Sequence, residues 1–186
     1  MTRIVAGVAR GRRLRVPRGR AIRPTTDRVR EALFSSVESV LGAFAGLRVL
    51  DLYAGSGALG LEAVSRGAAY ALLVESDPAA VRAIRENVAA TGLGDVEVRP
   101  GAVERVLAAP PAAPFRLVLA DPPYAMEAEE LTRVLGLLTH GWLAADALVV
   151  VERSRRAAAV VWPSGLVGER QRNYGQTVLW YGRPAG

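Results

Sequence analysis

Short apolar runs alternate with helical segments over the middle of the chain, and this alternation limits the possible folds more than any other feature. Five runs rich in Val and Leu are typical of buried strands, at residues 47–52, 70–74, 96–99, 115–120 and 147–152. Four segments between them are expected to be helices, at 58–66, 78–90, 103–108 and 127–138. Alternation of this kind predicts a parallel sheet that is covered by helices on both faces.

The two ends of the chain follow a different pattern. Further short strands are expected at 3–8 and 12–16, which would turn at Arg10-Gly11, and at 158–162, 166–171 and 176–181. We expect the last two to form a hairpin that joins the sheet edge in the antiparallel direction. The sequence Pro24-Thr25-Thr26-Asp27 has the residues of a helix start, so a helix is expected over about 27–41.

A glycine-rich turn follows the first strand of the alternating region. Gly55, Gly57 and Gly60 match G-x-G-x-x-G between a predicted strand and a predicted helix. Glu75 ends the next strand, where a carboxylate can accept hydrogen bonds from both ribose hydroxyls of an adenosine. The pattern predicts a nucleoside-containing cofactor and leaves NAD and S-adenosylmethionine both open. The candidate cofactor contacts are Asp51, Tyr53, Ala54, Gly55, Ser56, Gly57, Glu75, Ser76, Ala102, Val103 and Asp121.

Asp51 favours S-adenosylmethionine over NAD. It lies near the end of its strand, beside the predicted cofactor site. An acid there would repel a pyrophosphate but could support the cationic amino-acid end of S-adenosylmethionine. The alternative is a loop-capping acid that accepts hydrogen bonds from backbone amides. After the third strand, Gly101-Ala102-Val103 lies where an adenine edge would be read. Many such proteins have an acid at the position of Ala102, so adenine would have to be read here by backbone groups or another side chain.

The run 115–120 is followed by Asp121-Pro122-Pro123-Tyr124. Neither proline has an N–H for a sheet ladder, so the strand must stop here while the proline carbonyls stay free to accept. A carboxylate, carbonyls and a ring at one point could hold a planar group that carries an NH₂. We therefore take Asp121, Pro122, Pro123 and Tyr124 as candidate catalytic residues. The alternative is an ordinary strand-ending turn with a surface tyrosine.

Positive charge is concentrated at one end of the chain. The formal net charge is +6, but residues 1–30 contain ten Arg and one acid, whereas the rest contains 14 Arg and 17 acids. This asymmetry predicts that a basic arm, residues 1–24, contacts a polyanion beside a main domain, residues 25–186. A solvated basic tail is the alternative. The candidate nucleic-acid contacts are Arg10, Arg12, Arg13, Arg15, Arg18, Arg20 and Arg23.

The composition argues against several other classes of protein. The chain has no Cys and a single His, His140, so we expect no disulfide and no thiolate or His-rich metal site. No apolar run approaches the ~20 residues of a membrane span, and no secretory signal is visible. We therefore expect a cytoplasmic protein with no metal. No surplus apolar surface helix argues for a dimer, so we expect a monomer.

Asp51, Gly55, Gly57, Glu75 and the Asp-Pro-Pro-Tyr segment, in this order and spacing, resemble the class I S-adenosylmethionine-dependent methyltransferases of exocyclic amino nitrogens. Over nearly its whole length the chain is similar to the bacterial 16S rRNA guanine-N2 methyltransferase family, through Arg3–Gly7, Arg23–Phe34 and Asn173–Thr177. The resemblance implies a Rossmann-like α/β fold with seven mostly parallel strands, the last antiparallel. It also implies S-adenosylmethionine as cofactor, a basic N-terminal extension that contacts 16S rRNA, and a small-subunit ribosomal particle as substrate.

Three other functions stay open from the residues. The nearest is a methyltransferase that acts on DNA adenine N6 or on a different rRNA guanine, because the same Asp-Pro-Pro-Tyr chemistry serves each amine. An NAD-dependent oxidoreductase would use the glycine-rich turn and Glu75 but would leave Asp51 and residues 121–124 without a role. A non-catalytic RNA-binding module would use neither the turn nor the proline segment.

Overall fold

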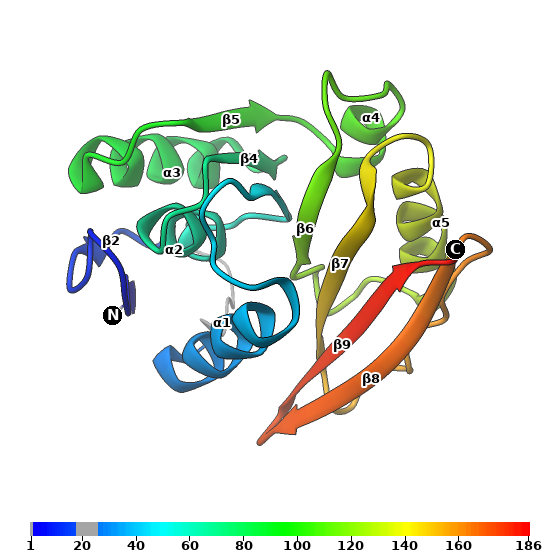
Figure 1. Ribbon diagram of the computed structural model, residues 1–186. Helices are drawn as coiled ribbons and strands as arrows, with labels where there is room; N and C mark the ends of the chain where they lie inside the picture. Colours follow the sequence, from blue (N-terminus) through cyan, green and yellow to red (C-terminus); the bar gives the residue numbers. More distant parts are fainter. Residues whose placement is uncertain (1, 18–25) are drawn as a thin grey trace.

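The chain folds around one seven-stranded sheet in the order β5-β4-β3-β6-β7-β9-β8 (Figure 1). The structure is a computed structural model, and it describes residues 2–17 and 26–186. The strands of the sheet are β3 Arg48–Leu52, β4 Tyr70–Glu75, β5 Val96–Pro100, β6 Phe115–Ala120, β7 Leu143–Ser154, β8 Leu166–Tyr174 and β9 Thr177–Pro184. The helices are α1 Asp27–Leu41, α2 Ala58–Ser65, α3 Pro78–Thr91, α4 Val103–Leu107 and α5 Ala128–Leu138. The predicted Rossmann-like fold is therefore confirmed.

The sheet reverses its strand order between β3 and β6. β3 pairs in parallel with β4 on one side and with β6 on the other, and Leu52 lies opposite Ala120 in that register. The loops after β3 and β6 therefore leave the same edge of the sheet as neighbours. In open α/β sheets this switch point is where ligands bind. The topology thus brings the glycine-rich turn and the Asp121 segment together.

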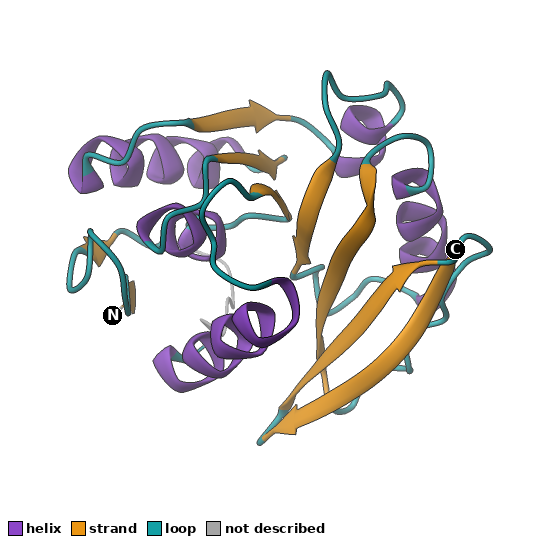
Figure 2. Cartoon of the chain, in the orientation of Figure 1, coloured by secondary structure: helices purple, strands orange, loops and turns teal. Residues whose placement is uncertain are grey.

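Two hydrophobic cores lie on the two faces of the sheet. Figure 2 shows the helices and strands that enclose them. Side chains alternate along each strand, so Val49 points into one core and Leu50 into the other. Helices α1, α2 and α3 contribute to the first core, and α4 and α5 to the second. The expected helix at 27–41 is present and has Thr26 as its N-cap, whose hydroxyl accepts a hydrogen bond from the Val29 amide at 3.3 Å.

The C-terminal hairpin is present, but one of the predicted strands is not. β9 runs antiparallel to both β7 and β8, which confirms the expected antiparallel last strand. The strand expected at 158–162 is wrong, because the structure places no strand there. A Cβ added at Gly168 or Gly182 would lie within 2.6 Å of the Trp162 ring, so the tryptophan occupies the space that two side chains would fill. The segment therefore packs across β8 and β9 instead of pairing with them.

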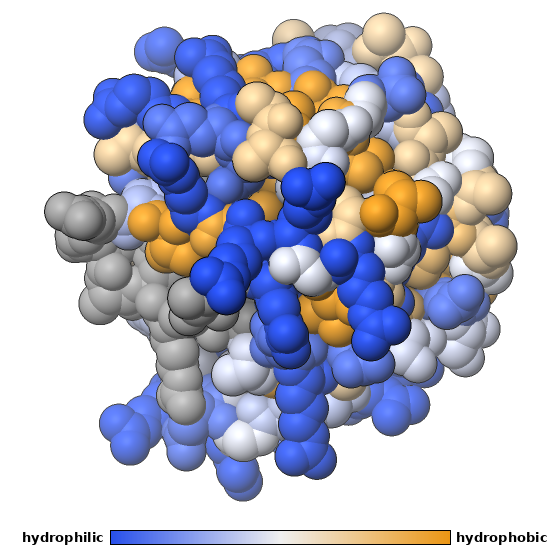
Figure 3. All heavy atoms as spheres, turned by 90° about the vertical axis from the view of Figure 1, so that its left-hand side faces the viewer, coloured by the Kyte–Doolittle hydropathy of each residue, from blue (hydrophilic) through white to orange (hydrophobic). Residues whose placement is uncertain are grey.

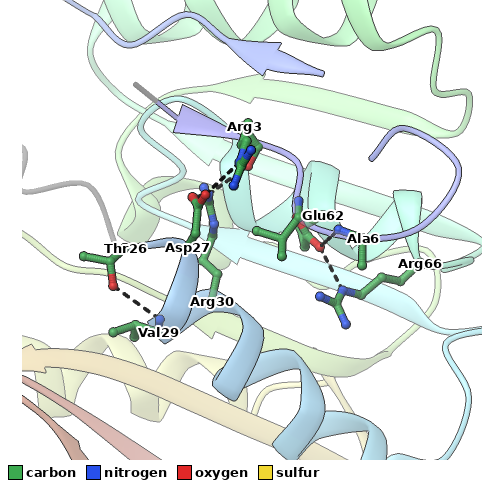
Figure 4. Close-up of polar contacts among 9 residues, drawn as sticks. Arg3, Ala6, Thr26, Asp27, Val29, Arg30, Glu62 and Arg66 are labelled. Atoms are coloured by element: carbon green, nitrogen blue, oxygen red, sulfur yellow. Dashed lines mark hydrogen bonds and ion pairs between the residues drawn. The ribbon is translucent and has the colours of Figure 1, made fainter. Parts of the chain in front are cut away.

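The N-terminal strands are shorter than predicted. β1 spans Thr2–Arg3 and β2 spans Arg13–Leu14, whereas strands at 3–8 and 12–16 were expected. The reason is that the backbone between them bonds to α2 instead. The Val5 and Ala6 amides donate to the two carboxylate oxygens of Glu62 at 2.7 and 2.9 Å (Figure 4). Further along, the Ala9 amide donates to the Ser65 hydroxyl at 3.0 Å.

The same N-terminal segment is tied to α1 and to a small core of its own. Arg30, which is 1% exposed, donates to the Arg3 carbonyl at 2.8 Å and to Asp27 at 2.6 Å (Figure 4). Ile4, Ala9 and Leu14 pack with Leu61 of α2 as a third buried cluster. The described part of the arm is therefore docked on the domain through both polar and apolar contacts. The expected boundary at residue 24 lies outside the described residues.

Candidate active site

Backbone hydrogen bonds hold the glycine-rich turn in place at the end of β3. The Ala54 amide donates to the Val74 carbonyl at 3.0 Å, and the Gly57 amide donates to the Ala54 carbonyl at 2.7 Å. Gly57 has φ +78° and precedes α2, and a Cβ there would lie 3.0 Å from Leu73. By contrast, a Cβ on Gly55 would meet no atom closer than 3.9 Å. The outer side of the turn is therefore open, whereas its inner side is packed.

Glu75 holds this turn from the end of β4. One of its carboxylate oxygens accepts from the Gly55 amide at 2.8 Å. The other accepts from the amides of Ser76 and Asp77, each at 2.8 Å. The side chain is 2% exposed, so these bonds compensate for the burial of a carboxylate. Its contact with a ribose remains a prediction.

Asp51 lies beneath the turn and bonds to α2. Its carboxylate accepts from the Gly60 amide at 2.8 Å, in a helix whose N-cap, Gly57, has no side chain to do so. Asp51 therefore does cap a backbone amide, as the alternative interpretation expected. Its contact with the cofactor remains a prediction. Burial first, and then the negative charge of Glu75, raise the pKa of Asp51 to about 7, although the Gly60 bond acts in the opposite direction.

Tyr53 is the strained residue of this region. It has φ +60°, which is uncommon for a residue with a Cβ. Its hydroxyl is buried and has no hydrogen-bond partner among the described residues. Burial first, followed by the charges of Glu104 and Glu130, raises the pKa of Tyr53. The hydroxyl lies within reach of the charges of α4 and α5, and an unpaired buried hydroxyl is a group that a polar ligand could satisfy.

The end of β5 offers backbone groups where an adenine was expected. The Gly101 amide donates to the Glu75 carbonyl at 2.9 Å, which brings this loop against the end of β4. Ala102 is exposed at the N-cap position of α4, and Val103 is buried behind it. Neither side chain can make a hydrogen bond. Any polar contact from these two residues must therefore come from their backbone.

The Asp121 segment turns away from β6 as predicted, but one of its carbonyls is occupied. The Pro123 carbonyl accepts from the Met126 amide at 3.0 Å, so the expectation that both proline carbonyls stay free was wrong. The cause is a tight turn toward α5. Pro122 is buried, whereas Tyr124 is 60% exposed.

Asp121, Pro122 and Tyr124 line a small pocket together with residues from neighbouring strands. The other lining residues are Glu152, Arg153, Ser154, Ala157 and Thr177. Burial, followed by the negative charges of Glu152 and Asp51, raises the pKa of Asp121 well above its usual range. Arg153 is buried and donates to the Met126 carbonyl at 3.0 Å, which fixes the loop after Tyr124.

Glu152 and Arg153 were not among the residues predicted for the site. Glu152 is the last residue of the apolar run 147–152 and Arg153 follows it. Both lie next to the end of β6, since Ala120 pairs with Val151. The signal that could have found them is the charged pair after Val149-Val150-Val151 in a strand parallel to β6. Parallel neighbours place their carboxyl ends at one edge of the sheet, so an acid there reaches the same pocket.

The arm arginines that the structure describes lie at the surface. Arg10, Arg12, Arg13 and Arg15 are exposed, and hydrophilic side chains gather on the side of the molecule that carries them (Figure 3). Arg15 also pairs with Glu86 of α3 at 3.0 Å. Arg18, Arg20 and Arg23 lie outside the described residues.

Asn87 of α3 joins the arm to the glycine-rich turn. Its side-chain oxygen accepts from the Arg15 amide at 2.7 Å, and its nitrogen donates to the Arg15 carbonyl at 2.9 Å. The same nitrogen donates to the Ser56 carbonyl at 2.9 Å. Asn87 is 1% exposed, so this link is shielded from water.

Residues 2–17 and 26–186 contain neither a candidate metal site nor a candidate membrane span. No three His, Cys, Asp or Glu side chains are grouped so that they could hold a metal ion. No helix in that part of the chain combines the length and hydrophobicity needed to cross a membrane.

The chain has a glycine-rich turn and an Asp-Pro-Pro-Tyr segment at adjacent strand ends of a Rossmann-like sheet. These features place it among the class I methyltransferases. A solved structure of that class, the putative methyltransferase yhhF from Escherichia coli, is 38% identical with a TM-score of 0.83, over 100% of this chain and 99% of that one. The family model described as "Conserved hypothetical protein 95" matches residues 2–183, and the chain belongs to this family.

Two curated relatives extend the comparison. The chain is 40% identical to the ribosomal RNA small subunit methyltransferase D of Escherichia coli strain K12, over 94% of this chain and 85% of that protein. It is 35% identical to the putative rRNA methyltransferase YlbH of Bacillus subtilis strain 168, over 94% of this chain and 95% of that one.

Proposed function

We propose that the protein transfers a methyl group from S-adenosylmethionine to the exocyclic N2 of a guanine in 16S rRNA, within a small-subunit ribosomal particle. The observation that carries the proposal is the pairing of β3 with β6, which sets the glycine-rich turn beside Asp121 and Pro122. The relatives whose names include rRNA methyltransferase support RNA as the substrate.

The residues around the turn suit S-adenosylmethionine. The open side of Gly55 leaves room for a ligand, and Tyr53 has a buried hydroxyl without a partner among the described residues. Glu75 would meet the ribose hydroxyls from the end of β4, and Asp51 lies next to the turn through its bond to Gly60. When bound, the cofactor supplies an electrophilic methyl group on a positively charged sulfur. Buried acids near that charge favour this cofactor over one with a pyrophosphate.

Asp121 and Pro122 would hold the target amine. The guanine N2 carries two hydrogens, and the Asp121 carboxylate and the Pro122 carbonyl can each accept one. Both residues line one pocket with Tyr124, whose exposed side chain can stack on a base that has been swung out of the RNA. Acceptors on both hydrogens orient the nitrogen lone pair, so much of the rate would come from positioning.

The amine must lose one proton once it has gained the methyl group. Asp121 is suited to take it because burial and the charges of Glu152 and Asp51 raise its pKa well above the usual range. The same carboxylate must be ionised to accept a hydrogen bond at the start. Asp121 would therefore act first as an acceptor and then as a base.

The proposal is tested by the choice of methyl acceptor. Purified protein with isotopically labelled S-adenosylmethionine should methylate 16S rRNA in small-subunit particles and should leave duplex DNA unlabelled, and the product should be N2-methylguanine. Asp121→Ala should abolish the labelling. Glu129→Gln, which changes an exposed acid at the start of α5, is the matched control and should label as the wild type does. Labelling of DNA adenine alone, or oxidation of a substrate with NAD, would refute the proposal.

A further inference from the structure

We propose that the turn after β7 and the adjoining β8–β9 hairpin form a second RNA-binding surface, which holds phosphates beside the target pocket through Arg155, Arg156 and Arg172. We call these three residues the hairpin arginines. The inference rests on the proposed function, because it assumes that the pocket at Asp121 receives a base from RNA.

The position of the turn is the first reason. Ser154 and Ala157 both line the pocket that contains Asp121 and Tyr124. Arg155 and Arg156 are the two residues between them, and both are exposed. Since consecutive Cα atoms are about 3.8 Å apart, both arginines are attached at the edge of the pocket. A base that enters the pocket would bring its own backbone phosphates to this edge.

The backbone that carries these arginines is fixed. The Arg155 amide donates to the Gln176 carbonyl at 2.8 Å, which joins the turn to the β8–β9 hairpin. The Ala157 amide donates to the Ser154 carbonyl at 3.0 Å, and the Arg156 amide donates to the Ser154 hydroxyl at 3.3 Å. A held turn presents the two guanidinium groups without the entropy cost of ordering a loop on binding.

Arg172 extends the charge along the hairpin. It pairs with Leu179 of β9, which in turn pairs with Glu152 of β7, so it lies in the cross-strand row that leads to the pocket. Like Arg155 and Arg156, it is exposed and makes no ion pair with a described residue. These cations are therefore available to phosphate, which guanidinium groups bind well.

The charge balance of the domain is the second reason. Residues 31–186 contain three more acids than arginines, so a general excess of positive charge does not account for arginines beside the pocket. Two acids, Asp121 and Glu152, line the pocket beside a single arginine, Arg153. Such a pocket would repel an RNA backbone unless cations lie next to it.

The β8–β9 hairpin and the arm belong to different edges of the sheet. The arm packs on α2 and α3, next to β4 and β5, whereas β8 forms the other edge of the sheet (Figure 1). RNA that touches both would be held on the two sides of the base that is methylated. Contacts at two sides of one site favour a bent or flipped-out strand over a regular duplex.

The test replaces the hairpin arginines with glutamine and measures RNA affinity against salt. Binding of unmodified 16S rRNA to the double variant Arg155→Gln/Arg156→Gln should weaken about tenfold at physiological salt, and the slope of log K against log salt should fall by about 1.5. Arg172→Gln alone should lower the slope by about half as much. The affinity for S-adenosylmethionine and kcat at saturating RNA should be unchanged, while KM for RNA should rise.

The matched control is Arg105→Gln/Arg133→Gln, which removes the same charge from exposed positions on α4 and α5. If the control and the hairpin variant lose the same RNA affinity, or if the hairpin variant binds as the wild type does, the inference is overturned. Thermal unfolding verifies that each variant is folded, and the charge-reversed pair Arg155→Glu/Arg156→Glu should weaken binding further. A wild-type protein that methylates no RNA would instead overturn the proposed function.

Discussion

The two halves of the active site are built differently although they lie side by side. The glycine-rich turn is held from behind by two buried acids, Glu75 and Asp51, that accept four backbone amides between them. The Asp121 segment leaves Pro123 and Tyr124 exposed, and a main restraint on it is one bond from Arg153 to the loop that follows. The cofactor side is therefore formed in advance, while the base side is open to a large substrate. Substitutions on the cofactor side and on the base side should therefore impair different properties of the enzyme.

The largest effect is expected on the open side. Asp121→Asn keeps the shape of the side chain but replaces the carboxylate with a neutral amide, which cannot take the proton that the amine loses, so methyl transfer should fall on the order of 10³-fold. Stability should not fall, because the change removes one of three mutually repelling acids. Single-turnover rates, thermal unfolding and calorimetry with S-adenosylmethionine separate these quantities. Equal losses of rate and of cofactor affinity would show that the cofactor side and the base side are not independent.

A change on the preformed side should lose binding and stability together. Glu75→Ala leaves the amides of Gly55, Ser76 and Asp77 without their acceptor, at a cost of about 3 kcal/mol in the free energy of unfolding. Urea unfolding and cofactor titration measure both effects. Glu97→Ala is the control, since that acid lies on β5 and bonds to Tyr70 and Arg99 at the surface. A stable Glu75→Ala protein with normal affinity would show that the turn does not need its buried acid.

A smaller change in the same place tests the packing of the turn. A Cβ at Gly60 would lie 2.7 Å from the Leu73 side chain and 3.1 Å from the Asp51 carboxylate. Gly60→Ala should therefore destabilise the fold by about 1–3 kcal/mol and weaken cofactor binding. Gly94→Ala should be neutral, because a Cβ there meets no atom within 4 Å. If both variants melt at the wild-type temperature, the turn is less tightly packed than the structure indicates.

The smallest effect is a shift in pH dependence. Asp121 must be ionised to accept the amine hydrogen, so the rate of methyl transfer should rise with pH as this carboxyl loses its proton. Burial and then the charge of Glu152 raise the pKa of Asp121, so Glu152→Gln should lower that pKa and move the rising limb to lower pH. The pH profile of kcat/KM measures this. A limb that moves to higher pH, or does not move, would show that Glu152 does not act on Asp121.

The sequence predicted the parts of the site that depend on local pattern. The glycine-rich turn, the end of β4 at Glu75 and the break after β6 each follow from residues within one short segment. Glu152 and Arg153 needed the register between β6 and β7, which no local pattern contains. The strand expected at 158–162 failed for a similar reason, because its sequence suits a strand but Trp162 fills the space over two paired glycines.

The described part of the arm is attached to the domain through its main chain, and this limits which sequence changes the arm can accept. Glu62, Ser65 and Asn87 bind the backbone groups of residues 5, 6, 9 and 15, which every amino acid except proline provides. Replacement of the arginine side chains should therefore be tolerated by the fold, so their number can be tuned to the polyanion. Insertion or loss of a residue should not be tolerated, since it would move every later amide away from its buried acceptor. Among homologues we expect this segment to vary in composition while its length stays constant.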